Sequence, residues 1–233
     1  NGVLKIPPFT TTVNEGQFSF AGQADFNEKV PLFRIAEPMQ IVKDIKINDE
    51  ITSELLKYVN PIFADSVNVS GSANFNCEQL AIPLKSESKN ETLVVGTISM
   101  NRVRLQGSNL LGQILTTSGG DPRGTDMTIH PTRFALQEGF LRYEDMQVDV
   151  GDNPVNFKGQ IGLDKSLDMT ATLPYTTRGR TARVGRETSG RRITLPIKGT
   201  VDAPELDLGK LLEDQLKGQL EEQLNKALED LFN

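Results

Sequence analysis

The sequence has little of what builds a disulfide-bonded protein, a zinc protein or a triad-based enzyme. It contains one cysteine, Cys77, and one histidine, His130. A lone cysteine cannot form an internal disulfide, and one residue of each type is too few for a zinc site. No Gly-x-Ser-x-Gly motif, phosphate-binding loop or Asp-x-Asp-x-Asp calcium loop is present. We therefore expect no enzyme, no metal and no cofactor. Paired-carboxylate hydrolysis stays a distant alternative, because strands can bring any two acids together, but nothing selects a pair.

Large aromatic residues and long apolar runs are also scarce. Tryptophan is absent, aromatic residues make up 6% of the chain and hydrophobic residues 37%. This composition predicts a thin, aliphatic core, as in a sheet with one buried face. The net charge of −6 argues against a nucleic-acid binder. Neither an apolar run of about 18 residues nor a signal segment occurs, so any membrane anchor is expected upstream of residue 1.

A short pattern, apolar-x-Gly-x-apolar-x-apolar, recurs along the chain and often closes with Asn or Asp. It occurs at residues 20–27, 69–76, 94–101 and 157–164, and in shortened form at 197–202. Each copy alternates with a period of two, which is typical of a strand with one apolar side. The glycine falls on the apolar side, where a bend or a crossing element needs room. Irregular spacing of the copies argues against a solenoid repeat.

The alternation predicts a single apolar face shared by many strands of one sheet. The candidate residues of this face are Phe20, Phe26, Val69, Phe75, Ile98, Phe157, Ile161, Ile197 and Val201.

Three segments are predicted to be helical. The first is capped by Asn48 or Asp49 and runs to about Val59, before Asn60-Pro61. Residues 108–117 form a second, short helix. The third covers 207–233, where leucines recur at every fourth position from 208 to 228. This spacing overshoots the helical repeat, so the apolar stripe winds around the helix and suits packing on a twisted sheet or on a partner.

An arginine-rich segment, 176–192, is predicted to be a long hairpin. Its glycines leave the backbone flexible, and Glu187 is its only acid. It is either a basic hairpin that contacts phosphate groups or an acidic partner, or a solvated loop without a ligand. The candidate anion contacts are Arg178, Arg180, Arg183, Arg186, Arg191 and Arg192.

Two blocks of the sequence resemble AsmA-like envelope proteins of bacteria. Residues 195–206 contain Pro196-Ile197-Lys198-Gly199-Thr200 followed by Pro204, and a leucine-rich tail follows. Residues 56–65, with Gly71 and Pro83-Leu84, are similar to a block in large AsmA-like proteins of the planctomycete–Verrucomicrobia type. The resemblance implies a periplasmic module, tethered to the inner membrane by a preceding segment, in the group that includes TamB-like proteins. In that group, curled sheets are thought to shelter lipid tails.

These observations predict a mainly β protein, built as a single curled antiparallel sheet with one apolar face, a short helix near 50–60 and a C-terminal amphipathic helix. The expected units are a β domain over 1–206, with a helix at about 49–59 and the hairpin 176–192, and a helix over 207–233. One hypothesis is a lipid-handling or outer-envelope assembly module whose partners are acyl chains or envelope proteins. The alternative is a structural or protein-interaction domain whose apolar face is closed by its own helices.

Overall fold

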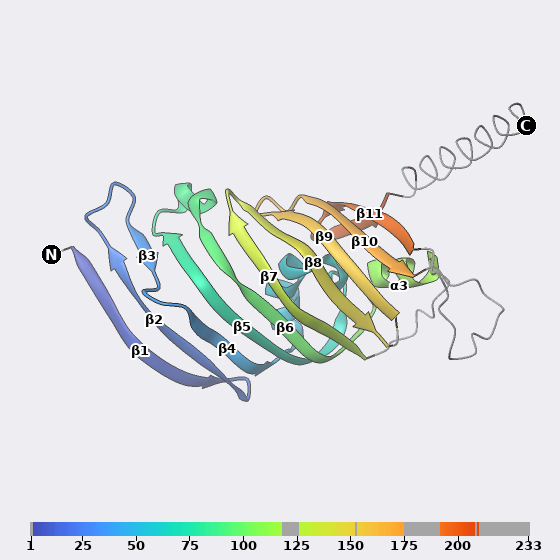
Figure 1. The fold of residues 1–233 in the computed structure, drawn as a ribbon, viewed down its shortest axis with the longest axis horizontal. Coiled ribbons are helices and arrows are strands. Elements are labelled where there is room, and N and C mark those ends of the chain that lie inside the picture. Colours follow the sequence, from blue (N-terminus) through green and yellow to red (C-terminus); the bar gives the residue numbers. More distant parts are fainter. Residues whose placement is uncertain (1, 118–125, 152, 175–191, 208, 210–233) are drawn as a thin grey trace, which may run out of the picture.

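The chain forms one curved antiparallel sheet (Figure 1). The computed structural model describes residues 2–117, 126–151, 153–174, 192–207 and 209. The twelve strands are β1 (Val3–Val13), β2 (Gly16–Asp25), β3 (Leu32–Arg34), β4 (Met39–Lys46), β5 (Val67–Pro83), β6 (Leu93–Gln106), β7 (Met127–Gln137), β8 (Phe140–Val150), β9 (Asn153–Gly162), β10 (Leu167–Pro174), β11 (Arg192–Thr200) and β12 (Ala203–Leu206). Neighbours along the chain are neighbours in the sheet, except that β3 and β4 both lie between β2 and β5. The predicted mainly β fold is confirmed.

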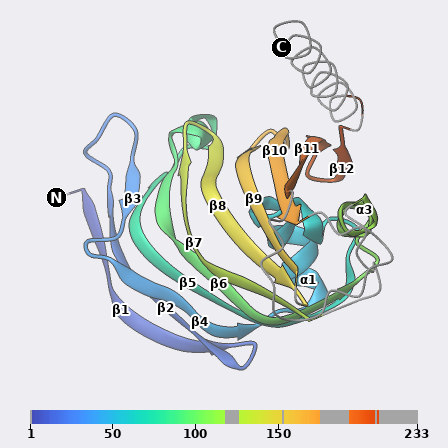
Figure 2. The ribbon, with the colours of Figure 1, turned by 45° about the vertical axis from the view of Figure 1, so that its right-hand side comes forward.

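The sheet curves like a trough, with β1 at one side and β12 at the other (Figure 2). Strand register places the apolar side chains on its inner, concave face. One row of paired residues runs Phe18, Val42, Phe75, Ile98 and Thr132 across β2, β4, β5, β6 and β7. Because side chains alternate between the two faces of a strand, the residues between these positions lie on the outer face.

The outer face is polar and held by ion pairs and hydrogen bonds between strands. Arg133 pairs with Glu78 at 2.9 Å, and Lys158 pairs with Glu144 at 2.7 Å. All four side chains are at least 39% exposed to solvent, so each pair contributes little to stability on its own. Because these charged side chains keep the outer face hydrated, the hydrophobic core forms on the concave face.

Helical segments cover one end of the concave face. The predicted helix at 49–59 is observed, but a π-helical turn divides it: α1 (Asp49–Ile51), η1 (Thr52–Leu56) and α2 (Lys57–Val59) follow one another. The Asn48 side chain caps α1 by accepting from the Ile51 amide at 2.9 Å. The short helix predicted at 108–117 is observed as α3 (Asn109–Thr117). Two 3₁₀ turns, η2 (Pro61–Phe63) and η3 (Ser86–Glu91), complete the set.

We call residues 49–63 together with α3 the helical cover. Figure 2 shows α1 and α3 inside the curve of the sheet, near β9–β12. The cover contributes buried side chains to a single core cluster with the sheet. From the cover these include Leu56, Ile62, Phe63, Leu110 and Ile114, and from the sheet Phe157, Ile161, Met169, Leu195 and Ile197. The core therefore lies between the helical cover and strands β5–β11, with Val69, Met100 and Ile129 contributed by β5, β6 and β7.

Glycines of the recurring pattern mark places where the backbone bends or another group approaches. Gly159 has a φ of 136°, a conformation that side chains rarely adopt, and a Cβ there would collide with the Asp168 carbonyl on β10. Gly96 has the Phe75 ring packed against it, and a Cβ would collide with that ring and with the Asn76 carbonyl. The glycines of the pattern therefore allow strands and rings to pack closely.

Two predicted segments fall outside the described residues. Of the helix predicted at 207–233, only residues 207 and 209 are described. Of the hairpin at 176–192, only Arg192 is described, as the exposed first residue of β11 opposite Pro174.

We expect Phe157→Ala to destabilise the fold by about 3–5 kcal/mol, because the ring is fully buried between the sheet and the helical cover. The adjacent Lys158→Ala is the control, since this side chain is 64% exposed on the outer face. Urea unfolding of both variants measures the difference. An equal loss in the two would show that the strand register is wrong.

Gly159→Ala is expected to cost about 1–3 kcal/mol, because alanine would be strained at positive φ and would also collide with β10. Gly112→Ala in α3 is its control, because nothing lies within 4 Å of a Cβ there. Alanine in a helix should raise stability by about 0.5–1 kcal/mol. If both variants shift the midpoint of thermal unfolding in the same direction, the strained conformation and close contact assigned to Gly159 are wrong.

Candidate functional site: an open apolar trough

The concave face of β1–β7 carries a surface of phenylalanine side chains. Phe9 lies on β1, Phe18 and Phe20 on β2, and Phe33 on β3. The rings of Phe20 and Phe33 stack with centroids 5.1 Å apart, and Phe18 stacks on Phe20 at 6.0 Å. The centroid of the Phe9 ring lies 6.3 Å from the centroid of each of the two β2 rings. These four rings form one continuous aromatic cluster.

A second aromatic pair continues the surface on β5 and β7. The rings of Phe75 and Phe134 stack at 5.7 Å across Gly96 of β6. Val42 joins the two aromatic groups, because it pairs with Phe18 on one side and with Phe75 on the other. We call this surface the open floor: Phe9, Phe18, Phe20, Phe33, Phe75 and Phe134.

The open floor is much less buried than the core at the other end of the same face. Phe9 is 45% exposed, and of the other five rings only Phe33, at 8%, is buried. Phe157 on β9, by contrast, is fully buried under the helical cover. Monomeric proteins rarely expose large contiguous apolar surface, so an open aromatic floor marks a candidate binding surface.

An interruption between β3 and β4 helps to open the floor. β2 pairs with β3 at residues 23–25 and with β4 at residues 17–18, so residues 19–22 have no ladder partner on that side. Residues 35–38 cross this gap as a loop. Gly22 lies in the gap, and a Cβ there would collide with the Phe33 ring. The missing side chain thus lets Phe33 lie flat and stack on Phe20.

Ion pairs fasten the helical cover to the sheet. The Asp202 carboxylate, in the turn between β11 and β12, accepts from Lys57 of α2 and from Lys165 of the β9–β10 turn, each at 2.7 Å. These hydrogen bonds, from Lys165 first and Lys57 next, lower the pKa of Asp202 from 3.8 to about 2. One carboxylate therefore joins the cover to two turns of the sheet.

The residues predicted to share the apolar face are not equally covered. Val69, Phe157, Ile161, Ile197 and Val201 are buried in the core cluster, and Ile98 lies at its margin. Phe20 and Phe75 are half-buried in the open floor. Phe26 differs from the expectation: β2 ends at Asp25, and Phe26 is 52% exposed at the end of the sheet. The closing Asn27, whose amide donates to Asp25, turns the chain before Phe26 can join the row.

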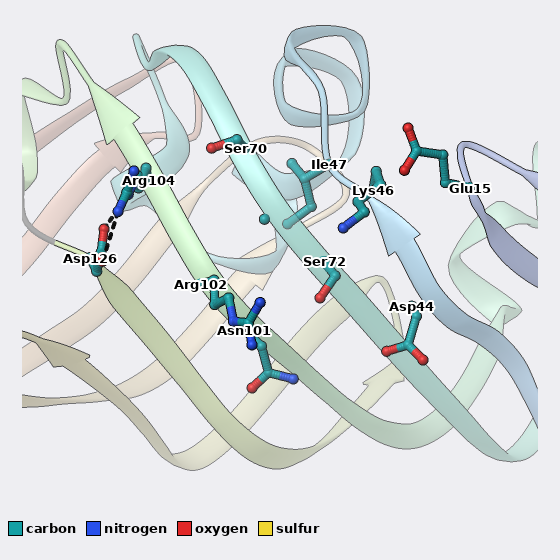
Figure 3. A pocket seen from close by; sticks show the side chains of 11 residues that line it. Glu15, Asp44, Lys46, Ile47, Ser70, Ser72, Asn101, Arg102, Arg104 and Asp126 are labelled. Atoms are coloured by element: carbon teal, nitrogen blue, oxygen red, sulfur yellow. Dashed lines mark hydrogen bonds and ion pairs between the residues drawn. The ribbon is translucent and has the colours of Figure 1, made fainter.

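A polar hollow lies on another part of the sheet. A groove of about 890 Å³ is lined by eleven residues, among them Glu15, Asp44, Lys46, Arg102, Arg104 and Asp126 (Figure 3). Arg104 pairs with Asp126 inside it. We call this the polar groove. Its three acids and three cations balance, so it has no net charge that would select one sign of ligand.

The titratable groups singled out from the sequence have ordinary structural partners. His130 pairs with Asp149 at 2.6 Å, and hydrogen bonds from His130 and then Gln147 hold the pKa of Asp149 below its usual range. Cys77 is buried, and burial raises the pKa of its thiol to about 11. Among the described residues no three His, Cys, Asp or Glu side chains gather in a way that could hold a metal ion.

Comparison with protein-family models, with curated proteins and with solved structures finds no match to this chain. Within the ranges that the structure describes, no helix has the length and apolar character needed to cross a bilayer.

Sequence reasoning found the apolar face but missed its division into a covered part and an open part. The position of the helices is the reason: residues 49–63 precede β5 in the chain, yet Asn60 donates to Met146 of β8 and Lys57 pairs with Asp202 after β11. The clustering of phenylalanine in residues 9–33 was the available signal for the open floor.

We expect Asp202→Asn to lower the unfolding midpoint at pH 7, because both lysines lose their charged partner. The wild-type carboxylate is protonated as the pH falls from about 4 through its folded pKa of about 2. The gap between wild type and variant should therefore shrink over this window and vanish below it. Thermal unfolding at stepped pH measures the gap, with the exposed Asp168→Asn as control. A gap that stays constant from pH 7 to pH 2 would exclude the ion pairs as its cause.

Proposed function

We propose that the open floor shelters the acyl chains of lipids, and that the chain is a non-enzymatic module of a bacterial envelope protein. The observation that carries the proposal is the set of six phenylalanines across β1–β7, of which five stay partly or largely exposed. Removing apolar surface of this kind from water favours ligand binding by a free energy of about 25 cal/mol per Å².

The shape and chemistry of the floor favour a chain-like apolar ligand. The floor is continuous from Phe9 on β1 to Phe134 on β7, so a long ligand can contact several strands at once. Thr132 is a polar side chain at its margin, and its hydroxyl is already bound to the His130 carbonyl at 2.9 Å. A ligand lying here therefore meets rings and aliphatic groups, with few hydrogen bonds to satisfy.

The resemblance to AsmA-like proteins supports the same ligand class. It also supports a periplasmic location and a tether to the inner membrane by a segment preceding this chain. Location and tether remain part of the proposal, together with a role in outer-envelope assembly.

A second candidate is a structural or protein-interaction domain whose helices close its own apolar face. The buried cluster under the helical cover favours it for β8–β12 and for the covered parts of β5–β7. The exposed ring of Phe9 and the half-buried rings of β2, β5 and β7 favour lipid binding for the rest of the face. The two candidates differ in whether the open floor takes up an apolar ligand.

Titration with a fluorescent fatty acid, and its displacement by phospholipid, tests the proposal. Phe20→Glu places a charge in the centre of the floor and should weaken binding at least about tenfold, or about 1.4 kcal/mol. Gln23→Glu, on the exposed outer face of the same strand, should bind as wild type does. Phe75→Glu, on a different strand, provides a second floor variant, and circular dichroism checks that each protein is folded. Equal affinity in all four proteins would exclude the floor as the binding site.

A further inference from the structure

Exposed hydrophobic side chains gather at one rim of the trough. Among the described residues, nine large hydrophobic side chains are exposed, and five of them lie where β1 begins and where β2 and β5 end. We call these five the rim patch: Val3, Leu4, Phe26, Ile82 and Leu84. Leu4 is 57% exposed and Phe26 is 52% exposed.

The rim patch spans the ends of four neighbouring strands, its members lying at the ends of β1, β2 and β5; Leu4 points to the concave face and Val3 to the outer face. The Phe26 amide donates to the Gly2 carbonyl at 2.7 Å, which holds the end of β2 beside the start of β1. The Leu84 amide donates to the Pro31 carbonyl at 2.9 Å, which holds the end of β5 beside the start of β3. With a strand spacing of about 4.8 Å, the patch spans roughly 14 Å.

The rim patch joins the open floor directly. Leu4, Ala24, Phe33 and Ile82 form one row across β1, β2, β3 and β5. Phe33 in this row stacks on Phe20 of the floor at 5.1 Å. An apolar path therefore leads from the rim to the centre of the floor.

Charges around the rim patch are mixed. Lys29, Lys85 and Lys89 are exposed in the two neighbouring loops, together with Glu87 and Glu91. Glu28 is neutralised by Arg34 at 2.7 Å. The long lysine stems can keep their ammonium groups in water while apolar neighbours are buried. The polar groove on β4–β6, toward the opposite ends of the strands, is lined mainly by charged and polar side chains instead.

We propose that the rim patch inserts into the interfacial layer of a phospholipid bilayer and presents the open floor to it. This inference rests on the proposed function for its purpose, because it names where an acyl chain would enter. A bilayer fits better than a protein partner because the exposed side chains lie at strand ends and loops and continue as an apolar row into the open floor, where an acyl chain would enter. The near balance of charge predicts that binding depends only weakly on anionic lipid.

The absence of tryptophan allows a direct test. Phe26→Trp places a single indole in the rim patch, and Val67→Trp places one at the start of β5, the opposite end of that strand. Both positions are 52% exposed. With vesicles of phosphatidylcholine, alone or with phosphatidylglycerol, the emission of Trp at 26 should shift to the blue and be quenched by brominated acyl chains. Trp at 67 should show neither change.

A second pair of variants separates docking from ligand binding. Phe26→Asp combined with Leu84→Asp should reduce vesicle co-sedimentation at least about fivefold while leaving fatty-acid affinity within about twofold of wild type. Val67→Asp should reduce neither. If fatty-acid binding fails in wild type while the blue shift persists, the proposed function falls and the docking stands.

Three results would overturn the inference. The first is no blue shift at position 26 with either vesicle. The second is an equal shift at positions 26 and 67, which means non-specific adsorption. The third is a shift that appears without vesicles and grows with protein concentration, which means that the rim patch contacts a second copy of this chain.

Discussion

The concave face of the sheet has more apolar surface than the helices described here cover. Strand alternation puts hydrophobic residues on one side of every long strand, so the face runs from Phe9 on β1 to Leu206 on β12. The helical cover reaches the last strands and buries Phe157 completely, but it leaves Phe9 nearly half exposed. Because apolar surface in water is unfavourable, this mismatch between a long face and a short cover is the constraint behind the proposed ligand.

The extent of the cover is set by a few interactions. Leu56, Ile62 and Phe63 anchor it in the core, and Asp202 ties it to two turns through Lys57 and Lys165. The outer face contributes differently, because its exposed ion pairs keep it hydrated. The trough is therefore asymmetric. Its inner face is apolar and its outer face is polar, and its β12 side is covered by helices while its β1 side is open. Exposed hydrophobic side chains gather at one rim, whereas the polar groove lies toward the other.

Local features of this fold could be predicted from the sequence, because they depend on neighbouring residues. Alternation identified the strands around Phe75 and Phe157, and Asn48 marked the start of the helix at 49. Phe26 was assigned to the apolar row because alternation alone does not show where a strand ends. The division of the face was beyond reach, since it depends on where residues 49–63 pack against β8 and the turn after β11, far along the chain. The rim patch was missed for a similar reason: Leu4, Phe26 and Leu84 meet only through strand pairing.

Native mass spectrometry of the wild-type protein, purified from a bacterial host and from a host-free synthesis supplied with phospholipid, tests the central claim most directly. The account predicts a bound species heavier than the bare chain by the mass of a phospholipid or fatty acid, which activation in the gas phase releases as a lipid. It also predicts that the bound fraction falls in Phe20→Glu. A protein that carries no lipid from either source, under conditions in which a known lipid-binding protein retains its ligand, would contradict the claim that the open floor is a lipid site.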